Sequence, residues 1–137
     1  LVKKTEEILD KLVQGQRVES VPPELNMLFR PSAQPFLISW LRYDPTKEIA
    51  KLRCQVLIVQ GTTDIQVSSQ DAKALADANP KPTLLIIEGM NHVLKMVPKD
   101  GASQVSSYSD PTLPVSPALI SAIIEFVNEA TGQARSN

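Results

Sequence analysis

The sequence has little of several residue types on which common functions depend. It contains one cysteine and one histidine, which excludes an internal disulfide and leaves too few ligands for a zinc set. The net charge is −1 and the lysines and arginines form no cluster, so we expect no nucleic-acid-binding surface. No apolar run approaches the length of a membrane span. These absences favour a soluble protein without a metal centre.

The chain nevertheless has the composition of a globular protein. Hydrophobic residues make up 42% and charged residues 21% of its 137 residues, enough for a real core. The first residue is Leu1, and a polar helical pattern follows at once, so the start does not read as a signal peptide. We expect any targeting segment to lie upstream, and the compartment stays open.

Residues 1–43 predict three short helices and no strand, over about 1–14, 22–29 and 32–43. Ser32 is expected to cap the third helix. Phe36, Leu37, Trp40 and Leu41 share one face of it, which favours core packing over a ligand cage. A strandless helical segment of this kind is typical of a lid domain. We place the domain boundary after residue 43.

Residues 44–137 predict an α/β unit. Apolar runs at 56–59 and 83–87 indicate two buried strands, which should pair in parallel because a helix at about 69–78 connects them. Ser68 and Asp71 are spaced as a capping box for that helix. Ser116 and Pro117 are expected to open a last helix with a broad apolar face formed by Leu119, Ile120, Ile123, Ile124 and Val127.

Two connecting segments carry weaker expectations. Cys54, just before the first strand, is expected to be a small buried hydrophobic residue. About twenty residues between His92 and the last helix are rich in Ser, Pro, Asp and Gly, which favours a solvated loop. The alternative is a wall of a substrate entrance, because the segment starts at the histidine.

A sheet of only two parallel strands is marginal, because parallel pairs are normally found inside larger sheets. The strand at 56–59 therefore needs a neighbour that this sequence does not contain, and we expect the chain to be part of a larger fold. In isolation the open strand edge predicts self-association by strand pairing or swapping.

Asp64 and His92 occupy matching positions in this unit. Asp64 ends Gly61-Thr62-Thr63-Asp64 and His92 ends Gly89-Met90-Asn91-His92, each directly after a predicted strand. In parallel α/β sheets the chemistry is found at such strand ends. A carboxylate and an imidazole that meet there suit the acid and base of a nucleophilic triad, and the two glycines are expected to permit tight turns.

Taken singly, each residue has a simpler interpretation. A lone loop histidine more often makes a local hydrogen bond, and an aspartate after a strand more often forms an Asx-turn. Their paired positions around one strand-helix-strand unit favour the triad. A phosphorylated aspartate of a flavodoxin-like receiver is disfavoured, because the expected acidic cluster and later lysine are not evident.

The residues around this pair resemble the α/β-hydrolase superfamily, specifically lid-bearing serine hydrolases of the monoglyceride-lipase or serine-aminopeptidase type. The similarity covers about 43–96 and the final helix. Two motifs carry it, the segment 84–92 and the segment 43–67, which ends Gln60-Gly61-Thr62-Thr63-Asp64-Ile65-Gln66-Val67. The resemblance implies that Asp64 is the triad acid and His92 the general base. It also implies an acyl substrate and no cofactor. We expect Phe36, Trp40 and Ile65 to contact that substrate.

The sequence departs from this family at the nucleophile. The family carries its serine in a G-x-S-x-G turn upstream of the lid. Ser20, Ser32 and Ser39 lack the flanking glycines, and Gly101-Ala102-Ser103 follows no strand and lies after the histidine. We therefore expect a partial α/β-hydrolase fold, which supplies the acid and base of a hydrolase of esters, thioesters or amides. Its missing N-terminal half is the expected partner, and the chain alone should be inactive.

A non-enzymatic function stays open beside this one. The chain could be an interaction or assembly domain in which the Asp64–His92 pair is vestigial. A G-x-S-x-G segment after a predicted strand upstream would favour the hydrolase, and its absence would favour binding.

Overall fold

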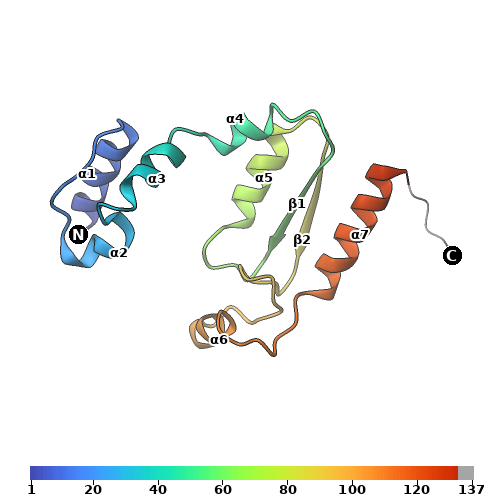
Figure 1. Cartoon of the computed structure of the whole chain (residues 1–137). Helices are drawn as coiled ribbons and strands as arrows, with labels where there is room; N and C mark the ends of the chain where they lie inside the picture. The colour runs from blue at the N-terminus through green and yellow to red at the C-terminus, as the bar shows by residue number, and fades with distance from the viewer. Residues whose placement is uncertain (133–137) are drawn as a thin grey trace. The chain divides into compact units, whose positions relative to one another are not determined.

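The structure is a computed structural model that describes residues 1–132. It shows a mixed α/β chain with a two-stranded parallel sheet, divided into two compact units, Leu1–Glu48 and Ile49–Asn137 (Figure 1). The division between the units falls five residues after residue 43, near the end of a short further helix, α4 (Pro45–Ile49), that the sequence did not predict. The Asp44 carboxylate accepts the N–H of Thr46 in its first turn, at 3.0 Å.

The first unit contains the three helical segments that its sequence predicts. They are α1 (Val2–Val13), a 3₁₀ turn η1 (Pro23–Leu25) that continues into α2 (Asn26–Phe29), and α3 (Gln34–Trp40). The prediction that Ser32 caps the third helix was wrong. Ala33 occupies the N-cap position and no side chain there bonds the helix.

One buried glutamine organises the loops of this unit. Gln34 is fully buried, and its amide donates to the backbone oxygens of Val18 and Phe29 and accepts the N–H of Val18, each at 2.8 Å. These bonds satisfy backbone groups that no helix would otherwise pair. Around them lies a small apolar core formed by Ile8, Leu12, Leu25 and Phe29.

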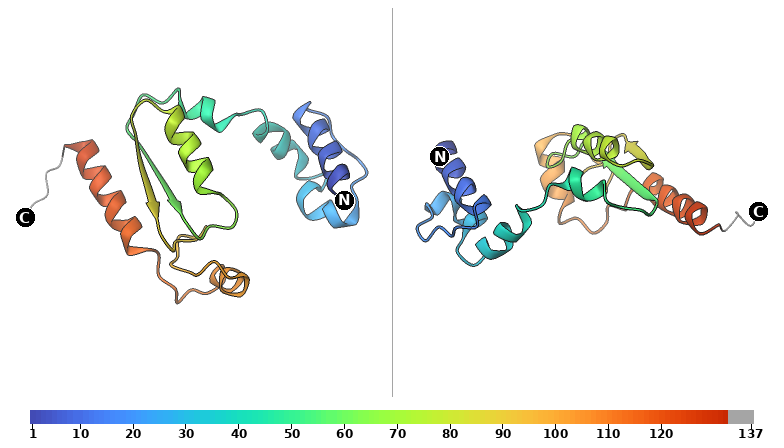
Figure 2. Two further views of the ribbon diagram at one scale, coloured as in Figure 1. Left: turned by 180° about the vertical axis from the view of Figure 1, so that it is seen from behind. Right: turned by 90° about the horizontal axis from the view of Figure 1, so that it is seen from above.

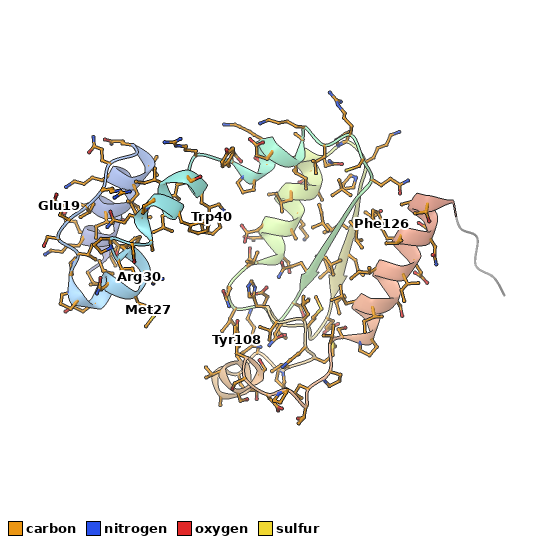
Figure 3. All side chains as sticks on the ribbon, viewed as in Figure 1. Glu19, Met27, Arg30, Trp40, Tyr108 and Phe126 are labelled. Atoms are coloured by element: carbon orange, nitrogen blue, oxygen red, sulfur yellow. The ribbon has the colours of Figure 1, made fainter. Side chains whose placement is uncertain are left out.

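The aromatic residues of α3 do not lie in that core. Leu37 and Leu41 pack against it, whereas Phe36 and Trp40 are 66% and 64% exposed (Figure 3). Their rings contact each other instead, with centroids 5.8 Å apart. The prediction that these two aromatic residues are core was therefore wrong. A period-3.6 pattern identifies a helical face but not what covers it.

In the second unit, the two expected strands and their parallel pairing are confirmed. Strand β1 (Val56–Gly61) pairs with β2 (Pro82–Ile87) in a register that places Gly61 opposite Ile87. Helix α5 (Ser69–Ala78) connects them and begins with the predicted capping box between Ser68 and Asp71. Helix α5 covers one face of the sheet and α7 (Pro117–Thr131) lies along the other (Figure 2).

Helix α7 buries less of its apolar face than the sequence suggests. Only Leu119 is buried, against Ile87 and Met90, while the other four apolar residues are 45–55% exposed: Ile120, Ile123, Ile124 and Val127. Ser116 is the N-cap residue as predicted, but its side chain does not cap the helix. Its buried hydroxyl has no hydrogen-bond partner within the described residues.

Two expectations for the connecting segments were wrong. Residues after His92 include a further helix, α6 (Gly101–Ser107), opened by Asp100, whose carboxylate accepts the N–H of Ser103 at 2.8 Å. Gln104 and Ser107 of this helix are fully buried, so the segment is packed rather than a solvated loop. Cys54 is exposed and not a core residue.

Across residues 1–132, every helix is too short or too polar to cross a lipid bilayer.

Gly61 is required by close packing and not by a turn. Its φ is not in the left-handed region, in contrast to Gly89 at +78°. A Cβ atom on Gly61 would lie 1.9 Å from the backbone oxygen of Met90. The end of β1 therefore approaches the histidine-bearing loop more closely than any side chain permits. A tight turn does follow Gly61, since the N–H of Asp64 donates to Gly61 O at 3.5 Å, but it needs no positive φ at this glycine. At Gly89 the positive φ fits the expected turn.

Gly61→Ala should destabilise the chain by about 2 kcal/mol or more, because backbone must move to admit the methyl group. The measurement is urea-induced unfolding followed by circular dichroism. Gly101→Ala is the matched control, since a Cβ there meets nothing within 4 Å. Equal stability of the two variants would contradict the close approach.

Candidate active site

The loops that follow β1 and β2 are joined by backbone hydrogen bonds. The N–H of Thr62 donates to Ile87 O at 3.0 Å and that of Thr63 to Met90 O at 3.2 Å. The Thr62 hydroxyl also accepts the N–H of Gly89, at 3.0 Å. The pairing of the strands thus continues past the sheet and fixes the two loops side by side.

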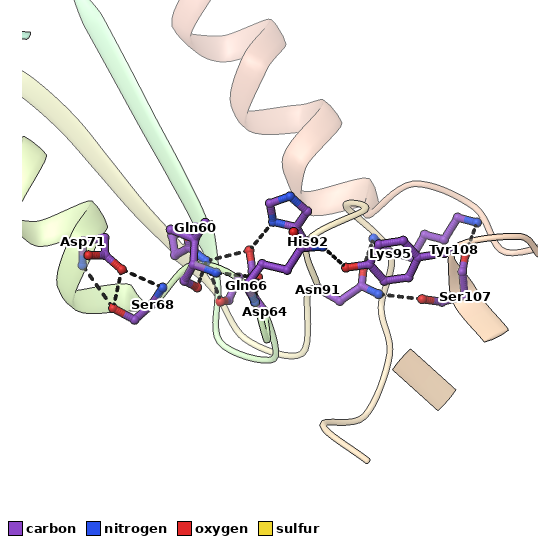
Figure 4. Close-up of polar contacts among 12 residues, drawn as sticks. Gln60, Asp64, Gln66, Ser68, Asp71, Asn91, His92, Lys95, Ser107 and Tyr108 are labelled. Carbon is purple, nitrogen blue, oxygen red and sulfur yellow. Dashed lines mark hydrogen bonds and ion pairs between the residues drawn. The ribbon is translucent and has the colours of Figure 1, made fainter. Parts of the chain in front are cut away.

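This arrangement brings Asp64 and His92 into contact. Asp64 Oδ2 and His92 Nδ1 are 3.0 Å apart, which is a hydrogen-bond distance (Figure 4). The Asp64 side chain is 7% exposed and that of His92 is 39% exposed. Within residues 1–132 the other ring nitrogen, Nε2, has no hydrogen-bond partner. The imidazole is therefore held on one side by a buried carboxylate and open on the other.

The Asp64 carboxylate is almost fully bonded. Its Oδ1 accepts the N–H groups of Gln66 at 2.7 Å and Val67 at 3.0 Å, and its Oδ2 accepts Gln60 Nε2 at 3.1 Å beside His92. The bond to Gln66 is an Asx-turn, so the local interpretation of this aspartate holds together with the contact to the histidine.

These contacts set the charge of Asp64. Burial opposes ionisation, but the hydrogen bonds from Val67, Gln66, His92 and Gln60 outweigh it and lower the pKa of the carboxyl below its usual value. A carboxylate that stays ionised can fix the tautomer of an imidazole and stabilise its cation. Asp64 has the electrostatics that the acid of a triad needs.

Gln60 is a site residue that the sequence reasoning missed. It is 7% exposed, and its amide nitrogen lies within hydrogen-bond distance of Asp64 Oδ2, Gly61 O and Val67 O. The sequence signal that could have identified Gln60 is its position as the one polar side chain in an otherwise apolar strand, directly after the apolar run at 56–59. A buried amide at such a position must find partners, and here they include the Asp64 carboxylate.

The histidine is carried by a tight loop. Met90 and Met96 pair across it, and Asn91 bonds Lys95. Leu94 in this loop has φ +65°, a left-handed conformation that is uncommon for a residue with a branched side chain. Strained backbone of this kind is often found beside functional groups.

A small cavity of about 180 Å³ has both Asp64 and His92 among its lining residues. Ligand pockets usually measure about 300–1,000 Å³, so this space suits the reacting end of a substrate rather than a whole one. No serine or cysteine of the described chain is among its lining residues: Val59, Gln60, Gly61, Asp64, Val67, Met90, Asn91, His92 and Leu94.

The remaining candidate residues lie elsewhere. Ile65 is 54% exposed and does not line this cavity, and Phe36 and Trp40 belong to the first unit. Ser103 lies in α6 and makes no hydrogen bond to His92. In the described part of the chain, no three residues of the types His, Cys, Asp and Glu are grouped to hold a metal ion.

Comparison with protein-family models, curated proteins and solved structures gave no match. The interpretation of the site therefore depends on its geometry. That geometry consists of an ionised carboxylate with a buried side chain, an imidazole bound to it through Nδ1, and a small cavity that both residues help to line.

Asp64 should make the fold more stable at neutral than at acid pH. Because its pKa is lower in the folded than in the unfolded chain, its contribution is present above the unfolded value, near 3.8, and is lost as pH falls through the folded value. Asp64→Asn should therefore flatten the dependence of the unfolding free energy on pH over the acid range, from pH 5 down to about pH 2–3.

The control for this experiment is Asp77→Asn, which removes an exposed carboxylate without a hydrogen bond to any described residue. Denaturant unfolding at a series of pH values gives the slopes. The same acid slope in Asp64→Asn and the wild-type chain would contradict the assignment.

Substitutions at Leu94 should reveal the strained backbone. Leu94→Ala and Leu94→Gly both remove the side chain, but only glycine adopts a positive φ without cost. The glycine variant should be more stable than the alanine variant by about 1 kcal/mol in urea unfolding. A more stable alanine variant would show that the left-handed conformation is not held in solution.

Proposed function

We propose that Asp64 and His92 are the acid and the general base of a catalytic triad in a serine hydrolase of the α/β-hydrolase type. The observation that supports this most is the bond between His92 Nδ1 and Asp64 Oδ2, which leaves Nε2 without a partner among the described residues, in a histidine that helps to line a small cavity. A base must present an unprotonated nitrogen to its nucleophile, and this pairing presents Nε2.

The chemistry follows from the two nitrogens. When Nδ1 carries the ring proton and donates it in a hydrogen bond to Asp64, Nε2 has a free lone pair. Nε2 can then take the proton of an attacking hydroxyl. The imidazolium that forms is stabilised by the ionised carboxylate. Nε2 then returns the proton to the leaving group of an ester, thioester or amide, and the same cycle activates water to release the acyl group. These steps need no cofactor.

In this proposal the nucleophile comes from polypeptide outside the described residues. The cavity lining contains no hydroxyl or thiol side chain between residues 1 and 132. Over the same range β1 pairs only with β2, so its other edge is available to a further strand. A nucleophile-bearing part of the fold that adds a strand there would complete both the sheet and the triad. The substrate of the completed enzyme would be a small molecule that carries an acyl group.

The 137-residue chain should give no turnover of p-nitrophenyl esters, because it presents a base without a nucleophile. The same residues, expressed together with the coding sequence that precedes Leu1, should hydrolyse them. In that longer protein Asp64→Asn should lower kcat by about 10⁴-fold and His92→Ala by at least as much.

Asp77→Asn is again the control and should leave kcat unchanged. The proposal fails if the preceding sequence has no G-x-S-x-G segment, or if turnover of the longer protein is insensitive to His92→Ala. The first of these results would favour the alternative of a binding domain with a vestigial pair.

A further inference from the structure

His92 has few bonds of its own. Within residues 1–132 its one hydrogen bond is to Asp64, and its side chain is 39% exposed. A half-exposed ring with a single partner is free to rotate away from it unless the backbone beneath is fixed. The position of His92 therefore depends on the residues beside it in the loop.

Asn91 closes that loop. Its N–H donates to Lys95 O at 2.9 Å, and its side-chain Oδ1 accepts the N–H of Lys95 at 3.0 Å. The N–H of Leu94 donates to Asn91 O, also at 3.0 Å. Three bonds to one residue thus define the five-residue turn in which His92 is second.

Asn91 also attaches the loop to helix α6. Its side-chain nitrogen donates to Ser107 Oγ at 2.8 Å, and that hydroxyl donates to Gln104 O at 2.7 Å (Figure 4). Asn91 is 1% exposed and Ser107 is fully buried, so solvent does not compete for these bonds. Lys95 adds a second attachment, since its ammonium donates to Ser107 O at 2.8 Å.

The same helical segment reaches the loop of the acid. Gln66 and Tyr108 are joined through the glutamine amide nitrogen and the phenol oxygen. Gln66 is also one of the two residues whose backbone N–H binds Asp64. Helix α6 and the tyrosine after it therefore contact both the loop of Asp64 and the loop of His92.

We propose that Asn91 is a positioning residue that holds the His92 imidazole on Asp64, and that α6 is the brace that fixes Asn91. The inference rests on the proposed function, because it concerns the same acid and base. It goes further in assigning a role to an asparagine that has no hydrogen bond to either ring nitrogen of His92, and to the helix that binds this asparagine. Asn91 acts through the backbone of the turn, and Ser107 acts through Asn91.

A purely structural role for Asn91 would have a different signature. Asn79 provides the comparison, because it is 6% exposed and also uses both ends of its amide, donating to Ile49 O at 2.9 Å and accepting Lys81 N at 3.1 Å. It lies before β2, at the opposite end of the strand from His92. Asn79→Ala and Asn91→Ala should lose similar stability, but only the second should disturb the histidine.

The test is proton NMR of the 137-residue chain at low temperature, with the side-chain nitrogens labelled. His92 is the only histidine, so a downfield proton on an imidazole nitrogen belongs to it. The wild-type chain and Asn79→Ala should show a protected Nδ1 proton. Asn91→Ala should lose the signal through fast exchange with water, and Ser107→Ala should broaden it.

Each outcome decides one question. A signal in the wild-type chain that persists in Asn91→Ala and Ser107→Ala overturns the positioning role and leaves the proposed function standing. No signal in the wild-type chain overturns the pair itself, and the positioning role with it. If Asn91→Ala does not fold, Ser107→Ala decides, because it keeps every Asn91–Lys95 bond and the bond from Lys95 to Ser107 O, and removes the hydroxyl that joins Asn91 to α6. An unchanged, sharp signal in that folded variant overturns the proposal.

Discussion

The site depends on the register of two parallel strands. With Gly61 opposite Ile87, the strands end together, and the backbone N–H groups of Thr62 and Thr63 continue the pairing into the histidine loop. A shift of one residue would reverse the face of every side chain and separate the two loops. The contact of Gly61 with Met90 makes such a shift sterically costly. The Asp64–His92 bond is therefore a consequence of the pairing of β1 with β2, which lies several residues earlier in the chain.

The two members of the pair differ in how fully they are bonded. The bonds of Asp64 to backbone N–H groups and to Gln60 hold its charge in place before any reaction begins. His92, by contrast, is left with one bonded and one open nitrogen. The proposed role of His92 as a general base requires this asymmetry, because the base must present an unprotonated nitrogen to its nucleophile.

The sequence was sufficient for the strands and for the start of α5, but not for every local pattern, since the side chains of Ser32 and Ser116 do not cap their helices. Apolar runs identified β1 and β2, and the spacing of Ser68 and Asp71 identified the start of α5. It failed where a tertiary partner decides. Asn91 is a buried polar residue whose acceptor, Ser107, lies 16 residues away, and α6 has a loop-like composition. Gln60 was missed although its acceptors lie within seven residues, because they depend on the path of the loop after β1. Phe36 and Trp40 were wrongly predicted to be core residues, because the pattern of a helical face does not specify what covers that face.

The central claim is that Asp64 holds His92 with its Nε2 lone pair free, and the tautomer of the ring tests it most directly. Long-range proton–nitrogen correlation spectra of the labelled chain, recorded at a pH where the single histidine is neutral, distinguish the two ring nitrogens. We predict a protonated Nδ1 and an unprotonated Nε2, and the reverse in Asp64→Asn. A proton on Nε2 in the wild-type chain would contradict the assignment of His92 as a general base.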